Sequence, residues 1–120
     1  MQRLDALVRQ YPILLNGEFF LRPTSVDGVN FTKLEDVLDN EGVIAWSRIA
    51  GDKEILCALN RNESEYAILF ATVDNDTHAV NSSMKCLFAS DLSPSELNIE
   101  TRNGKAIRLI IPPYALVIYM

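Results

Sequence analysis

The pattern of apolar and polar residues is clearest between Gly42 and Asn62, where residues 50–53 join two short apolar runs. Side chains in each run alternate between two faces, which is the periodicity of a β-strand. Gly51 can adopt the positive φ that a tight turn requires. The stretch therefore predicts a β-hairpin around the only tryptophan, Trp46. Because both faces are largely apolar near the middle, the hairpin is expected at the centre of a sheet.

Residues 2–11 follow a different period. Their apolar side chains recur at positions i, i+3, i+4 and i+7, which are Leu4, Leu7, Val8 and Tyr11. This single stripe predicts an amphipathic helix. Pro12 should end the helix, because proline lacks a backbone donor and disfavours helical geometry at the preceding residue. A helix this short is marginal alone, so its stripe must pack on another surface.

The rest of the chain predicts short strands separated by polar loops that contain glycine or proline. The expected strands are 18–22, 66–73, 84–89, 97–101, 106–111 and 114–120. Residues 24–30 and 74–83 are expected to form loops, and residues 33–38 a single helical turn. With the hairpin, the count is about seven or eight strands, which indicates a mainly β fold, an antiparallel β-sandwich with Greek-key connections.

Composition and charge narrow the class of protein. A chain of 120 residues with 48% hydrophobic residues can bury one core and fold as one globular domain. A net charge of −5, without a basic cluster, argues against a nucleic-acid partner. The longest apolar stretch is too short to span a bilayer, so no membrane partner is expected. The N-terminal residues lack a signal-peptide pattern, which favours a cytoplasmic location if Met1 is the natural start.

Few residues are candidates for chemistry. Cys57 and Cys86 lie in apolar runs and are expected to be buried, reduced thiols, with a disulfide between neighbouring strands as the alternative. The one histidine, His78, lies in a polar loop without a zinc-ligand spacing and is expected to be solvated. Asp74 and Asp76 resemble the start of a calcium loop, but the loop's glycine and bidentate glutamate are missing. No metal or other cofactor is predicted.

The acidic residues give no catalytic pair. Cleavage of a glycosidic bond needs two carboxylates about 5–10 Å apart on a rigid frame. The candidate carboxylates instead lie in expected loops or at their edges, where solvated carboxylates belong: Asp36, Asp39, Glu41, Asp74, Asp76, Asp91 and Glu96. No catalytic residue is therefore predicted.

Aromatic side chains leave one alternative open. Most of them lie in expected strands or in the helix stripe, where packing in the core is their usual role. Phe20 and Phe31 are expected to be the most exposed, and exposed rings can stack on sugar rings. A carbohydrate-binding module that contacts starch or glycogen through these two side chains is the alternative function.

Three segments together resemble the C-terminal all-β domain of α-amylase family glycoside hydrolases. The first is LDALVRQYP…NGEFFLRP at residues 4–23, which is similar to the family's junction between the last barrel helix and the C-terminal domain. The second is the hairpin VIAWSR…EILCALNRN at residues 43–62, and the third is the closing IPPYALVIY at residues 111–119. The segments occur in the family's order and span nearly the whole chain. The polar stretches 24–41 and 74–83 depart from the family pattern.

The resemblance implies that residues 1–13 are the end of a barrel-type helix and residues 14–120 a β-sandwich domain. It implies a non-catalytic accessory domain that packs on, and stabilises, a (β/α)8 catalytic barrel acting on α-glucans. The family's catalytic carboxylates lie at the ends of barrel strands, and no segment here corresponds to those strands. The implied partners are the barrel and an α-glucan. Leu4, Leu7, Val8 and Tyr11 would belong to the barrel interface, and the isolated domain would expose an apolar patch and self-associate through it.

Overall fold

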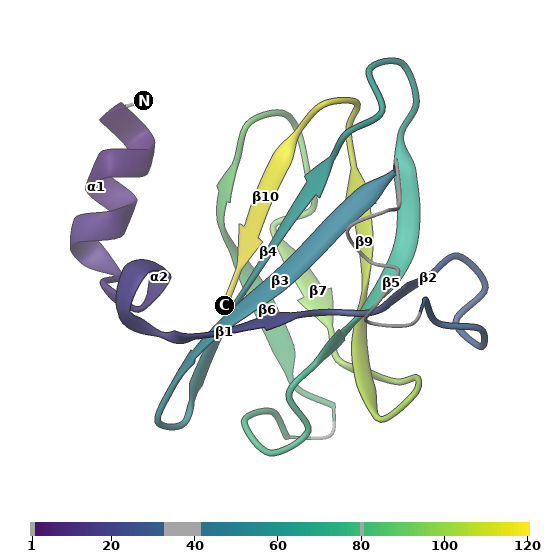
Figure 1. Ribbon diagram of the computed structural model, residues 1–120, viewed down its shortest axis with the longest axis horizontal. Helices are drawn as coiled ribbons and strands as arrows, with labels where there is room; N and C mark the ends of the chain where they lie inside the picture. Colours follow the sequence, from purple (N-terminus) through teal and green to yellow (C-terminus); the bar gives the residue numbers. More distant parts are fainter. Residues whose placement is uncertain (1, 33–41, 80) are drawn as a thin grey trace.

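The computed structural model describes residues 2–32, 42–79 and 81–120. Two antiparallel sheets face each other, and a pair of short helices lies beside one of them (Figure 1). This arrangement confirms the predicted mainly β sandwich. Residues 33–38, predicted as a helical turn, lie outside the described residues.

The first of the two helices follows the sequence pattern. Helix α1 (Gln2–Gln10) is the predicted amphipathic helix, and Pro12 separates it from α2 (Ile13–Asn16), which the pattern did not indicate. Four residues are too few to show a helical period. Gly17 ends α2 in a buried position, where a Cβ atom would lie 2.7 Å from the carbonyl oxygen of Ile13. A larger residue there would displace the helix.

Six strands form the first sheet, in the order β1-β3-β4-β10-β6-β7. Their bounds are β1 (Glu18–Leu21), β3 (Val43–Ala50), β4 (Lys53–Asn60), β10 (Leu116–Tyr119), β6 (Ser83–Ala89) and β7 (Glu96–Asn98). Strands β3 and β4 are the predicted hairpin, paired in register from Val43 opposite Asn60 to Ala50 opposite Lys53. Both have neighbours on their other sides, so the predicted central position is confirmed.

Four strands form the second sheet, in the order β2-β5-β9-β8. They are β2 (Thr24–Ser25), β5 (Ala67–Val73), β9 (Lys105–Ile111) and β8 (Glu100–Thr101). Strand β2 lies in a region predicted as a loop. The predicted single strand 97–101 is instead two strands, β7 and β8, which belong to different sheets. Ile99 lies between them, buried in the core. The chain therefore crosses from one sheet to the other at this residue.

The last predicted strand begins later than expected. Tyr114 lies in a turn with a φ of +57°, and β10 starts at Leu116. The turn follows Pro112 and Pro113, which have no backbone N–H to donate to a strand ladder. The N–H of Tyr114 instead donates to the carbonyl oxygen of Asn62, at 2.9 Å.

The main core fills the space between the two sheets. It contains alternating residues of both, including Val43, Ala45, Leu56, Ala58, Leu69, Val73, Met84, Ile107, Leu109, Ile111, Val117 and Tyr119. A second apolar cluster lies on the opposite, outer face of the six-stranded sheet. This sheet is therefore apolar on both faces, and its outer face needs a covering layer.

Candidate functional site

The outer face of the six-stranded sheet is the surface that the helices cover in part. Ile55, Cys57 and Ile118 point away from the main core, yet they are almost completely buried, because Leu7 of α1 packs on them. Leu4 and Tyr11 pack against the same cluster. Most of the predicted helical stripe therefore packs against this chain's own six-stranded sheet.

The cluster on this face extends beyond the helix stripe. Ile13, Leu14, Trp46, Leu87, Phe88, Leu116 and Met120 are only partly buried and pack against the cluster. The remaining stripe residue, Val8, is also partly buried. In Figure 1 both helices stand at one side of the sheet, with α1 nearest β6 and α2 nearest β3. Part of this apolar face is therefore left at the surface.

The aromatic side chains predicted as sugar contacts are not the exposed ones. Phe20 and Phe31 are both partly buried, and the guanidinium of Arg22 lies 5.6 Å from the centre of the Phe20 ring. Among the described residues, the exposed aromatic side chains are Phe19 (48%), Tyr66 (61%) and Tyr114 (70%). The exposure predicted for Phe20 and Phe31 is therefore wrong. Adjacent strand residues face opposite sides, and the sequence does not show which side stays open.

A buried carboxylate, Glu54, organises the most polar cluster in the interior. Its side chain is completely buried. Oε2 accepts a hydrogen bond from Nη2 of Arg22 at 2.8 Å, and Oε1 accepts one from the backbone N–H of Asp74 at 2.9 Å. Nε2 of His78 lies 2.7 Å from the same Oε1. Arg22 also donates from Nε to the hydroxyl of Ser47 at 2.8 Å. Each carboxylate oxygen therefore has partners.

These contacts keep Glu54 ionised. Burial raises the pKa of Glu54, but the hydrogen bonds from His78 and from the backbone of Asp74, with the charge of Arg22, outweigh it and hold the pKa below its ordinary value. The larger cavities among the described residues are lined by other side chains. The cluster is consequently a set of structural contacts in the interior, because the Glu54 side chain is completely buried and does not line these cavities.

The prediction of a solvated His78 is wrong, because only 11% of its side chain is exposed and it binds Glu54. Glu54 itself was missed among the candidate carboxylates. A signal for it was present, since Glu54, Leu56 and Ala58 alternate along β4 on the face that points into the core. Extending this alternation by one position places a carboxylate inside the sandwich, where it must find a partner.

The other candidate residues behave as loop and core residues. Asp74 accepts hydrogen bonds from the backbone N–H groups of Asp76 and Thr77, and Glu96 accepts one from the hydroxyl of Ser83. The predicted carboxylates at positions 36, 39 and 41 lie outside the described residues. In the described part of the chain, no three His, Cys, Asp or Glu side chains gather where a metal ion could bind. No helix there is long and apolar enough to cross a membrane.

Neither Cys57 nor Cys86 forms a disulfide bond in the structure, which agrees with the predicted thiols and not with the alternative of a disulfide between strands. Cys57 lies under α1, and burial raises its pKa to about 12. Cys86 is only partly buried, and its thiol donates to the carbonyl oxygen of Phe88 at 3.4 Å. The environment of Cys57 therefore does not favour a thiolate.

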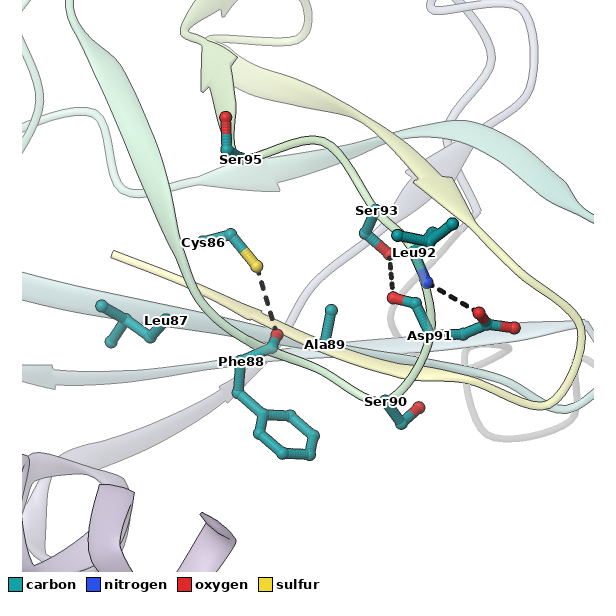
Figure 2. Close-up of a pocket in the computed structure, with 9 residues that line it drawn as sticks. All are labelled: Cys86, Leu87, Phe88, Ala89, Ser90, Asp91, Leu92, Ser93 and Ser95. Carbon is teal, nitrogen blue, oxygen red and sulfur yellow. Dashed lines mark hydrogen bonds between the residues drawn. The ribbon is translucent and has the colours of Figure 1, made fainter.

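Figure 2 shows a cavity of about 460 Å³ beside the segment that links β6 to β7. Several of its polar groups already have partners: the Asp91 carboxylate accepts from the N–H of Leu92, and the Ser93 hydroxyl donates to the carbonyl oxygen of Asp91. The Ser90 hydroxyl accepts from the backbone N–H of Leu116 on β10. All of its described lining residues lie between Cys86 and Ser95. Because polar groups from other elements do not converge on it, the cavity lacks the features of a ligand site.

No family model matches this chain, and no curated protein sequence matches it. Solved structures do match. The debranching enzyme from Nostoc punctiforme superposes with a TM-score of 0.62 at 16% identity, covering 98% of this chain and 20% of that chain. A native form of the same enzyme has a TM-score of 0.62 at 17% identity, with the same coverage. The alpha-amylase from H. orenii has a TM-score of 0.54 at 16% identity, covering 98% of this chain and 19% of that chain.

At these identities the superpositions establish the fold. This chain spans about a fifth of the length of the enzymes that it matches. The resemblance seen in the sequence is thereby confirmed at the level of structure: the chain folds as a β-sandwich that also occurs as a small part of debranching-enzyme and alpha-amylase chains.

Proposed function

We propose that this chain is a non-catalytic accessory domain of an amylase-like glycoside hydrolase, and that it packs on and stabilises a (β/α)8 catalytic barrel that acts on α-glucans. The observation that carries the proposal is the apolar outer face of the six-stranded sheet. The barrel would cover the part of this outer face that α1 leaves exposed.

In this proposal residues 1–13 are the end of a barrel helix and residues 14–120 are the accessory domain. The contact of Leu7 with Ile55, Cys57 and Ile118 is then one part of the interface between them. The stripe of α1 forms the helical side of that interface, so it is not free to meet a further helix. Trp46, Leu87, Phe88 and Leu116 extend the same face and would meet the rest of the barrel.

The non-catalytic role is supported by the chemistry of the interior. The one buried carboxylate described above, Glu54, is fully occupied by Arg22, His78 and the backbone of Asp74. The matched enzymes are about five times longer than this chain, which leaves room in them for a separate catalytic part. We therefore place catalysis in the barrel of the parent enzyme.

The experiment compares the chain with two charge variants by analytical ultracentrifugation and binding of an apolar dye. Self-association and dye binding are expected for the unmodified chain and should be lost in Phe88→Glu, which charges the outer face. The matched control, Val29→Glu, charges an exposed apolar residue in the loop after β2 and should change neither property. A monomeric chain that binds no dye would contradict the interface, and hydrolysis of maltooligosaccharides by the chain alone would contradict the non-catalytic role.

A second candidate function is contact with starch or glycogen as a carbohydrate-binding module. The observation that favours it is the exposure of Tyr66 and Tyr114 on neighbouring loops. Tyr66 and Tyr114 are therefore the candidate sugar contacts instead of Phe20 and Phe31, which are partly buried.

A further inference from the structure

Two loops at one end of the sandwich carry the most exposed aromatic side chains among the described residues. Tyr66 is the last residue of the connection from β4 to β5, and Tyr114 lies in the connection from β9 to β10. Their side chains are 61% and 70% exposed. Figure 1 shows both connections at the top of the molecule, away from the helices at its left side. The two connections therefore lie apart from the helices.

A single buried amide ties these two loops together. Nδ2 of Asn60 contacts the carbonyl oxygens of Glu65, Ile111 and Pro112 at 2.9, 3.1 and 3.2 Å. The backbone N–H of Tyr114 donates to the carbonyl oxygen of Asn62 at 2.9 Å. Because each loop is anchored to the other, the positions of both aromatic residues are set before any ligand binds, which lowers the entropic cost of binding.

The backbone of Tyr114 is unusual for an aromatic residue. Its φ of +57° lies in the left-handed region, which Cβ atoms of L-residues disfavour. Such conformations persist where the surroundings impose them, and they concentrate at binding sites. Here the result is an aromatic ring presented to solvent by a rigid turn.

A cavity of about 310 Å³ lies beside Tyr66, at the lower end of the range for small-ligand pockets. Asn62, Glu65, Val26 and Ile68 are among its lining residues. The Oδ1 atom of Asn62 accepts hydrogen bonds from the backbone N–H groups of Ser64 and Glu65. Within the described part of the chain, the Nδ2 group of Asn62 and the carboxylate of Glu65 have no hydrogen-bond partner, so donors and acceptors remain for a ligand.

A second cavity continues the first. Its volume is about 460 Å³, and it shares Val26 and Leu69 with the cavity beside Tyr66. Its lining adds short polar side chains from β2 and from the segment that follows it: Thr24, Ser25, Asp27, Asn30 and Thr32. The two adjoining cavities, called the trough below, are together lined by aliphatic side chains, by short polar side chains and by Tyr66.

The chemistry of this trough selects one class of ligand. None of the described residues that line either cavity is a lysine or an arginine, and the chain carries a net charge of −5, so an anionic ligand is disfavoured. An aromatic ring beside amide and carboxylate groups suits a ring that is apolar on one face and carries hydroxyls at its edge. An uncharged pyranose has this form.

We propose that the trough between Tyr66 and Asn30 binds an uncharged oligosaccharide, with one sugar ring stacked on Tyr66 and its hydroxyls bonded to Asn62 and Glu65. Tyr114 extends the aromatic surface for a longer chain. This proposal rests on the second candidate function, carbohydrate binding, and specifies where on the domain the sugar would bind.

The test titrates the full chain with maltoheptaose and, in parallel, with cellohexaose, by calorimetry and NMR. Tyr66→Ala should weaken binding of the preferred sugar at least tenfold. Tyr66→Phe keeps the ring and should retain the wild-type affinity. Phe19→Ala is the matched control, because Phe19 is also exposed but lies on β1, and it should leave the affinity unchanged. Amide shifts should concentrate in residues 60–68.

The outcomes separate the site from the function. Preference for maltoheptaose supports the site and an α-glucan ligand. Equal affinity for both sugars supports a site that recognises the sugar ring and does not distinguish the linkage between rings. Saturable binding that Tyr66→Ala leaves unchanged overturns this site but keeps the second function. Absence of saturable binding by both sugars overturns both, while the barrel-packing proposal stands.

Discussion

Nε2 of His78 lies 2.7 Å from Oε1 of Glu54 and joins the loop after β5 to the start of β4. The other carboxylate oxygen binds Arg22, which follows β1. Nζ of Lys105, on β9, donates to the carbonyl oxygens of Asn75 and His78 and holds the same loop from the second sheet. One buried carboxylate and one lysine thus fasten this loop to both layers of the sandwich.

Replacing Glu54 by glutamine should lower the free energy of unfolding by about 3 kcal/mol, because the change leaves Arg22 without its counter-ion in a largely buried site. Urea denaturation measures the effect. Glu63→Gln alters an exposed glutamate in the loop after β4 and should change the stability by less than about 0.5 kcal/mol. A loss below about 1 kcal/mol for Glu54→Gln would show that the cluster contributes little to stability.

The same carboxylate should make stability depend on pH. The pKa of Glu54 is lower in the folded state than in the unfolded state, so the unfolded chain binds its proton at a higher pH. The stabilisation is therefore complete above the ordinary glutamate pKa of about 4.3 and is lost as the pH falls through the lower, folded-state pKa. Wild type should lose more stability than Glu54→Gln between about pH 6 and about pH 3.

The comparison of the two proteins isolates this effect. Asp27 also has a lowered pKa, held down by the backbone N–H groups of Asn30 and Val29, and it contributes equally to both proteins. Denaturant midpoints at a series of pH values give both curves. Parallel curves would show that protonation of Glu54 is not coupled to unfolding.

Leu7→Ala should release α1 from the sheet while the sandwich stays folded. The substitution removes a buried side chain from Ile55, Cys57 and Ile118 and should cost the packing of the helix about 2–3 kcal/mol. Hydrogen exchange should speed up in α1 and stay slow in β5 and β9. Leu15→Ala is the control, since Leu15 is largely exposed. Uniformly faster exchange would show that helix and sandwich unfold as one unit.

The two thiols should react at different rates with iodoacetamide at neutral pH. Cys57 is buried, and its pKa of about 12 leaves almost no thiolate. Cys86 is partly exposed and should react first. Mass spectrometry should find one modification in the folded chain and two in urea. Cys86→Ser should abolish the fast modification, and equal rates in the folded chain would contradict the burial of Cys57.

Local sequence patterns were sufficient for the elements whose residues contact their neighbours in the chain. The alternation around Gly51 predicts both strands of the central hairpin, because their pairing is closed by a short turn. The helical stripe likewise predicts α1 and the need for a surface beneath Leu7. The burial of Cys57 follows from the apolar run that contains it. For these residues, sequence neighbours supply most of the information.

Other features depend on which segments meet across the fold. Glu54 and His78 are 24 positions apart, and only the packing of two sheets brings the loop histidine onto the strand carboxylate. The division of residues 97–101 between two sheets follows from the burial of Ile99. The exposure of Phe19 in place of Phe20 has the same origin. Periodicity shows which side chains share a face. Which layer covers that face depends on contacts between residues far apart in the chain, and local sequence patterns do not show these contacts.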